Sequence, residues 1–148
     1  MNDAPILICF DGSADAVRAI ETSAELLGPH RAVVLDIGPP FSPEESLATL
    51  APVVPSFEEL NASQAGQVAA RGAEIARASG FDAEARAAVA APTWQGIVDV
   101  AHELDVPLIV IGSRGLSGLK EMIDGSLSHQ VAEHAGRPVL ITPPPNGS

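Results

Sequence analysis

The sequence has one cysteine, few basic residues and no long apolar run. Cys9 is the only cysteine among 148 residues, which excludes an internal disulfide framework and a zinc site built from several cysteines. Eight lysines and arginines stand against nineteen acidic residues, and the net charge of −11 repels the phosphate backbone of nucleic acids. No run approaches the roughly 18 apolar residues of a membrane crossing, and the start Met-Asn-Asp-Ala-Pro lacks a basic signal region. We therefore expect a cytoplasmic protein that binds neither nucleic acid nor membrane.

The chain nevertheless carries enough apolar material for one core. Hydrophobic residues make up 46% of the sequence, and the mean hydropathy is +0.21. Because an average domain takes roughly 150 residues, we expect a single domain over 1–148. Residues 38–60 hold five of the thirteen prolines, which predicts a long surface excursion there. The proline-rich end, 143–148, is predicted to be a frayed tail.

Short apolar runs without polar alternation are typical of strands that are covered on both faces. Such runs lie at 6–10, 32–37, 108–111 and 138–142. A weaker run at 81–89 completes a set of five. Because alanine favours helices, a helix over 83–88 stays open as the alternative for that run.

Stretches with helical spacing of apolar residues separate these runs. They lie at 17–27, 62–79, 94–104 and 126–135. Gly28 and Gly80 are placed to end the first two, and Thr93 is available to cap the third. The alternation of strands with helices predicts an α/β protein, with a parallel sheet and helices on both faces.

Two predicted strands end in segments of unusual composition. Asp11-Gly12-Ser13 follows the first strand, and the fourth is followed by a loop of the pattern G-x2-G-x9-G-S. Its first glycines, Gly112 and Gly115, have no Cβ, so their backbone can approach an anion closely. Gly125 and Ser126 open a helix, whose first N–H groups attract negative charge. This pattern predicts a phosphate site, to which Ser113, Ser126 and Ser128 could add hydroxyls and Arg114 or Lys120 a positive charge.

These residues resemble a universal stress protein of the nucleotide-binding type. The resemblance rests on Asp-Gly-Ser after the first strand, on the glycine loop and on the closing segment from Gly125 to Thr142. It covers essentially the whole chain, and 38–60 matches least. It implies a Rossmann-like, five-stranded parallel sheet of order 3-2-1-4-5. It also implies a stress-response regulator that binds ATP or another adenine nucleotide, with Mg²⁺ as a further candidate. A homodimer through the last strand, Val139 to Thr142, is implied as well.

The resemblance also assigns the binding residues. The adenosine end would meet Asp11, the backbone at Phe10 and the end of the second strand near Ile37. The nucleotide and its phosphates would lie along Ile111, Gly112, Ser113 and Gly115, and the phosphates would be cradled by Gly125, Ser126, Leu127 and Ser128. Two departures stand out: Asp124 replaces a commonly apolar residue just before the phosphate-binding Gly-Ser, and Ala90-Ala91-Pro92 replaces Gly-Asp-Pro.

Several plainer interpretations stay open. Gly112 and Gly115 could only form a tight turn, Asp11 could cap the first helix with or without touching a ligand, and Arg114 and Lys120 could be solvated charges. The histidines show no metal spacing, and His129 with Glu133 is predicted to be a surface pair. The chain has no Walker sequence, so we expect little or no nucleotide turnover. A slow ATPase and a dimeric module that has lost its ligand are the alternatives, and a phospho-accepting receiver domain fits poorly.

Overall fold

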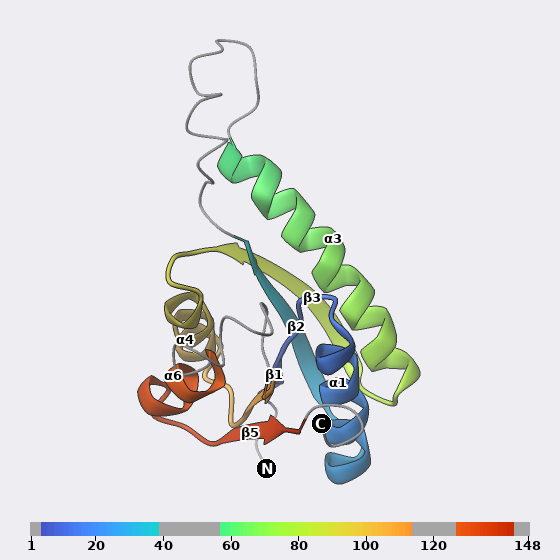
Figure 1. Cartoon of the computed structure of the whole chain (residues 1–148). Helices are drawn as coiled ribbons and strands as arrows, with labels where there is room; N and C mark the ends of the chain where they lie inside the picture. The colour runs from blue at the N-terminus through green and yellow to red at the C-terminus, as the bar shows by residue number, and fades with distance from the viewer. Residues whose placement is uncertain (1–3, 39–56, 114–126, 144–148) are drawn as a thin grey trace.

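The computed structural model describes residues 4–38, 57–113 and 127–143 (Figure 1). The five strands are β1 (Ile6–Cys9), β2 (Arg31–Gly38), β3 (Asp82–Val89), β4 (Ile109–Gly112) and β5 (Val139–Thr142). They form one parallel sheet of order β3-β2-β1-β4-β5, which confirms the expected topology. Strand β1 pairs with β2 on one side and with β4 on the other. The winding of the chain therefore reverses between β1 and β4.

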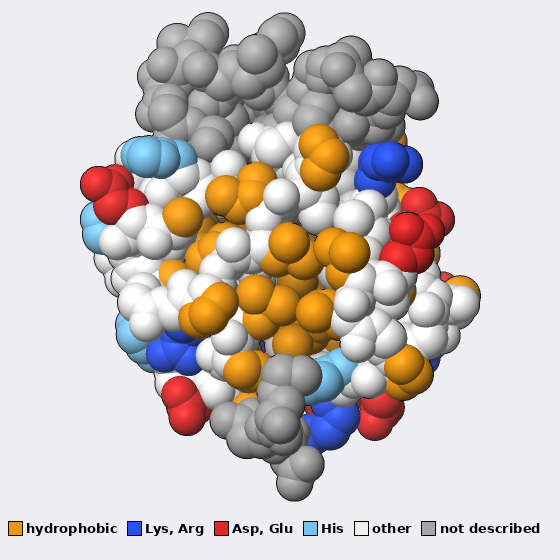
Figure 2. All heavy atoms as spheres, turned by 90° about the horizontal axis from the view of Figure 1, so that it is seen from below, with side chains coloured by type: hydrophobic (Ala, Val, Ile, Leu, Met, Phe, Trp, Pro, Cys, Tyr) orange, Lys and Arg blue, Asp and Glu red, His pale blue; other side chains and the backbone are white. Residues whose placement is uncertain are grey.

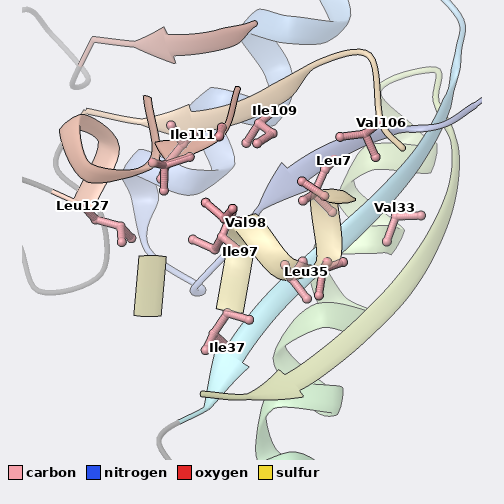
Figure 3. Close-up of a cluster of buried hydrophobic side chains, with 14 residues drawn as sticks. Leu7, Val33, Leu35, Ile37, Ile97, Val98, Val106, Ile109, Ile111 and Leu127 are labelled. Carbon is pink, nitrogen blue, oxygen red and sulfur yellow. The ribbon is translucent and has the colours of Figure 1, made fainter. Parts of the chain in front are cut away.

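Helices cover both faces of the sheet. Helices α1 (Ala14–Leu27) and α3 (Phe57–Ala78) lie on one face, and α4 (Thr93–Leu104) and α6 (Leu127–His134) lie on the other (Figure 1). Successive β1 residues point to opposite faces. Ile6 and Ile8 belong to the core under α1 and α3, whereas Leu7 belongs to the core under α4 and α6. In the second core, Ile97 and Val98 of α4 meet apolar side chains of the sheet (Figure 3).

Some elements differ from the sequence-based expectation. Helix α3 begins at Phe57 rather than at 62, so its first residues lie inside the predicted excursion. The alternative helix at 83–88 is wrong, because every residue of β3 is in register with β2 and Ala83 is buried. Pairing in the sheet overrides the helix propensity of alanine there. Thr93 is the first residue of α4 and Pro92 is its N-cap, so Thr93 does not cap the helix. The rest of the predicted excursion, 39–56, and the tail, 144–148, lie outside the described residues.

In the part of the chain that the structure describes, no helix combines the length and the apolar character of a membrane span.

Helix α3 lies very close to the sheet because it carries a glycine at the point of contact. A Cβ atom on Gly72 would lie 2.6 Å from Cδ2 of Phe10 and 2.8 Å from Cγ1 of Val34. Both distances are shorter than any ordinary carbon contact. The absent side chain thus sets the depth at which α3 packs, and it holds Phe10, the residue that follows β1, in place.

We predict that Gly72→Ala destabilises the protein, although alanine favours helices more than glycine does. The clash with Phe10 and Val34 should cost about 1–3 kcal/mol of unfolding free energy. Gly66→Ala, on the same helix, is the matched control, because nothing lies within 4 Å of its Cβ position. It should stabilise the protein by roughly 0.5–1 kcal/mol. Urea unfolding of both variants measures the two effects, and a Gly72→Ala variant as stable as Gly66→Ala would contradict the packing.

Candidate functional site

A pocket lies at the carboxyl ends of the central strands, where the winding reverses. Counted out to its open mouth it has a volume of about 370 Å³, and inside the mouth its walls stand close together. Six predicted site residues from separate parts of the chain line it: Phe10, Asp11, Ile37, Ile111, Gly112 and Leu127. A pocket at such a reversal is the usual ligand position in open α/β sheets.

The turn after β1 is held by Asp11 and Ser13. Oδ1 of Asp11 accepts hydrogen bonds from the Ser13 N–H, at 2.9 Å, and from the Ser13 hydroxyl. Oγ of Ser13 in turn accepts from the N–H of Ala16 at 3.1 Å, so Ser13 is the N-cap of α1. The interpretation of Asp11 as the cap itself is therefore wrong, because Ser13, two residues further along the chain, is the residue that caps the helix. Asp11 fixes the cap residue and also lines the pocket.

Phe10 and Ile37 lie at the ends of β1 and β2. The N–H of Phe10 donates to the carbonyl oxygen of Leu35 at 2.9 Å, and its side chain is 3% exposed. A backbone contact from Phe10 to a ligand would therefore have to use its carbonyl oxygen. Ile37 points into the core beside Ile97, and together these two side chains form an apolar wall of the pocket (Figure 3).

Gly112, at the end of β4, meets the first turn of α1. A Cβ atom there would lie 3.1 Å from Oδ2 and 3.3 Å from the backbone oxygen of Asp15, which is buried. The position thus calls for glycine because α1 packs against it. The sequence predicts a different reason for glycine here, the close approach of an anion. The packing of α1 does not test that reason, which stays a prediction.

Two buried hydroxyls lie near the same strand end. The N–H of Ser113 donates to the carbonyl oxygen of Thr142 at 2.9 Å, which ties the residue after β4 to β5. Among the described residues, neither Oγ of Ser113 nor Oγ1 of Thr142 has a hydrogen-bond partner. A buried hydroxyl without a partner is costly, so Ser113 offers a donor that an anionic ligand could satisfy.

The far end of the glycine loop returns to the same pocket. Helix α6 begins at Leu127, and Leu127 and Ser128 are both buried. Leu127 lines the pocket together with Gly112, so the residues that flank the loop on both sides come together. The residues between them that were predicted to bind or to matter, Arg114, Gly115, Lys120, Asp124, Gly125 and Ser126, lie outside the described residues. Their roles stay predictions.

Sequence reasoning missed Asp36. This half-buried carboxylate lines the pocket from the end of β2. Burial, and then the charge of Asp11, raise its pKa from 3.8 to about 6, against a hydrogen bond from the backbone of Ile37 that lowers it. The available signal was a single acidic residue inside the otherwise apolar Val-Val-Leu-Asp-Ile.

Cys9 also lines the pocket, but its thiol is unreactive. Burial raises the pKa of its thiol to about 12, and the charges of Asp11 and Asp36 add to the effect. The thiol therefore stays protonated and packs as a small hydrophobe, as the sequence suggested.

The histidines lie apart from the pocket. Nε2 of His129 is 3.7 Å from a carboxylate oxygen of Glu133, and both side chains are exposed, which confirms the predicted surface pair. Trp94, at the start of α4, stacks on His134 of α6 with ring centroids 4.2 Å apart. Within 4–38, 57–113 and 127–143 there is no group of three or more histidine, cysteine or acidic side chains arranged to hold a metal ion.

The fold and this pocket together define a Rossmann-like, doubly wound α/β protein with a narrow pocket at the switch point. Residues 4–143 match the model of the universal stress protein family. The chain is also 33% identical over 143 residues to the universal stress protein YxiE of Bacillus subtilis, which covers 92% of this chain and 96% of that protein. The chain therefore belongs to the universal stress protein family.

Solved structures share the fold. A universal stress protein in complex with cAMP superposes with a TM-score of 0.66 at 23% identity, and the match covers 95% of this chain and 98% of that one. The universal stress protein of Archaeoglobus fulgidus in complex with dAMP has a TM-score of 0.63 at 23% identity, with the same coverage of both chains. At these identities the likeness establishes the architecture of the chain.

We predict that Asp36→Asn changes how stability depends on pH. Because the pKa of Asp36 is higher in the folded state, its carboxyl binds a proton more tightly there than in the unfolded chain. The folded state therefore loses stability as the pH rises from about 4 to about 6. The asparagine variant avoids this loss. At neutral pH its free energy of unfolding should therefore exceed that of the wild type by about 1 kcal/mol, after allowance for solvent screening.

Urea unfolding of the wild type and the variant, at several pH values from about 4 to neutrality, measures the difference in unfolding free energy. Asp82→Asn is the control, because Asp82 is an exposed carboxylate at the opposite end of the strands. A difference between wild type and Asp36→Asn that is the same at every pH would contradict the burial of this charge.

Proposed function

We propose that this chain binds an adenine nucleotide, ATP or a related adenylate, in the switch-point pocket and acts as a stress-response regulator with little or no turnover. One observation carries the proposal: Gly112, the first glycine of the motif, and Leu127, the first described residue after it, line the same pocket as Asp11 and Ile37. Both ends of the motif therefore lie where the resemblance puts a nucleotide. Relatives in complex with cAMP and with dAMP support the class, since both ligands contain adenine and one phosphate group.

The groups along the pocket favour one orientation of such a ligand, with its phosphate near β4 and its base near β2. The start of α6, at Leu127, carries the positive end of a helix dipole, so a phosphate group fits the end near β4. Ser113 follows β4 directly without lining the pocket, and its hydroxyl, which has no partner among the described residues, is a further donor at that strand end. The end near β1 and β2 carries the carboxylates of Asp11 and Asp36, which repel phosphate and accept hydrogen bonds from a sugar or a base. Because the described walls stand close together, we expect side chains at the mouth to move apart when the base enters.

Rapid hydrolysis has little support in the residues of the loop. Phosphoryl transfer requires a positioned water, a base and cations that stabilise the transferred group. The loop contains only Arg114 and Lys120 as cations and no histidine. Mg²⁺ would arrive with the nucleotide, and Asp124 would be the loop carboxylate nearest in sequence to the phosphate-binding Gly-Ser. The predicted cytoplasmic location belongs to the same proposal.

We predict that saturating ATP raises the melting temperature. At about 1,000 times its dissociation constant, a ligand stabilises the folded state by roughly 4 kcal/mol, on the order of 10 °C for a chain of this size. Gly115→Val should abolish the shift, because a side chain there would keep the backbone away from the phosphates. Ser117→Val, in the same loop at a position that the motif leaves open, should retain it.

Thermal melts with ATP, ADP and AMP, with and without Mg²⁺, measure these shifts. Analysis of the supernatant of denatured protein tests for nucleotide that co-purifies. If no adenine nucleotide is found and none shifts the melt, the alternative of a module that has lost its ligand is correct. Turnover near one per second would instead favour the ATPase.

We also propose that two copies of the chain pair through β5. This strand forms one edge of the sheet, and its Ile141 is 42% exposed, which is unusual for a large apolar side chain. Figure 2 looks onto the side of the molecule where β5 lies and shows hydrophobic side chains gathered at its centre. A second copy that adds its own β5 would satisfy the open strand edge and cover these side chains.

We predict that Ile141→Lys converts the dimer to a monomer, because a charge would be buried in the pair. Ala70→Lys is the control: Ala70 is exposed on α3, which packs on β2 and β3 toward the other edge of the sheet, and this variant should stay dimeric. Sedimentation at micromolar concentration reads out the mass. A wild-type chain that sediments as a monomer, or an Ile141→Lys variant that stays dimeric, would exclude this interface.

A further inference from the structure

We infer that Asp36 determines which base the pocket accepts, by receiving the exocyclic amino group of adenine and disfavouring bases that carry an oxo group at that position. The inference rests on the proposed function, because it assumes that a purine nucleotide occupies the pocket. It goes further in naming one side chain of this sequence and one edge of the base.

The charges along the pocket orient the ligand. The phosphate-favouring end lies at β4 and α6, and Asp36 lies at the other end, on β2. Strand β1 stands between them, and two strand spacings amount to roughly 10 Å. A phosphate group would be repelled by the two carboxylates, so the base must point toward β2. There Ile37 and Ile97 provide an apolar surface for a flat ring.

The polar groups near the base are mostly acceptors. The N–H of Ile37 already bonds to the carboxylate of Asp36, and the carbonyl oxygen of Gly38 already accepts from Ala90 at 3.1 Å. Asp11 is held on one oxygen by Ser13. Ionised carboxylates only accept hydrogen bonds. The described lining hydroxyls are those of Thr93, which can serve either way, and Ser13, which already donates to Asp11. A lining rich in acceptors can receive hydrogen bonds from an amino group, whereas an oxo group, itself an acceptor, would be repelled there.

Among the described residues, the neighbouring charge that acts most on Asp36 is a second carboxylate. Asp11 faces it from the turn after β1, and the neutral thiol of Cys9 faces it from β1. Strand β3 places Ala87 beside it in register. The guanidinium of Arg71 on α3 comes within 3.4 Å of the Cβ position of Gly12, which puts this cation at the turn. An amino group that donates to Asp36 would therefore relieve the repulsion between two carboxylates.

The experiment compares ATP with ITP, in which an oxo group replaces the amino group at position 6. Calorimetric titration should show that the wild-type chain binds ATP about 10- to 100-fold more tightly, the value of one hydrogen bond to a charged group. Asp36→Asn should reduce this preference to about threefold or less, because an amide can also donate to an oxo group. Asp82→Asn removes the same charge far from the pocket and should keep the wild-type preference.

A pH series supplies a second readout that a merely structural role would not move. Because the pKa of Asp36 is about 6, the wild-type preference for ATP should shrink as the pH falls below that value and the carboxyl gains a proton. Both nucleotides carry the same triphosphate, so its titration cancels in the ratio of their affinities. In Asp36→Asn the ratio should not vary with pH.

Each outcome has one meaning. A wild-type chain that binds ATP and ITP equally, or an Asp36→Asn variant with the full preference, overturns the role of Asp36 and leaves the proposed function intact. A wild-type chain that binds neither nucleotide overturns both. If Asp36→Asn is folded by far-UV circular dichroism but binds neither nucleotide, the wild-type pH series decides, and a ratio independent of pH overturns the inference.

Discussion

Strand β1 pairs in parallel with β2 on one side and with β4 on the other, and the pocket exists because of this double pairing. Ile6, Leu7 and Ile8 are almost completely buried, so the strand has no freedom to shift against its neighbours. The pairing brings the turn at Asp11 next to the end of β4 at Gly112, about a hundred residues away in the chain. Helix α1 then starts where the two strand ends meet, and its Asp15 packs against Gly112.

The same arrangement separates charges within an acidic protein. A net charge of −11 would repel a nucleotide if all charges acted together, but charges beyond roughly 10 Å are largely screened in physiological salt. What matters is the local order of groups across the pocket. The start of α6 stands at one end and two carboxylates at the other, so the pocket has a direction. A ligand with an anionic end and a hydrogen-donating end fits that direction.

Glycines serve packing here as much as ligand approach. Gly72 lets α3 lie against Phe10 and Val34, and Gly112 lets α1 lie against β4. From the sequence, Gly112 is predicted to admit a phosphate or to form a tight turn, and neither role involves contact with α1. From the sequence these uses look the same, because a missing side chain does not say which neighbour takes its place.

The sequence by itself determined the alternation of strands and helices along the chain and the parallel sheet, and it singled out the two strand ends at which the pocket lies. Apolar runs and helical spacing are local properties, and right-handed crossovers leave few topologies for them. Tertiary structure decided the rest. It made β3 a strand against the preference of alanine, because β2 offered a full ladder of partners. It also made Ser13, rather than Asp11, the N-cap of α1. It placed Asp36, one of nineteen acidic residues, in the lining of the pocket. Burial and neighbouring charge gave that carboxyl its raised pKa, and both arise only when the strands come together.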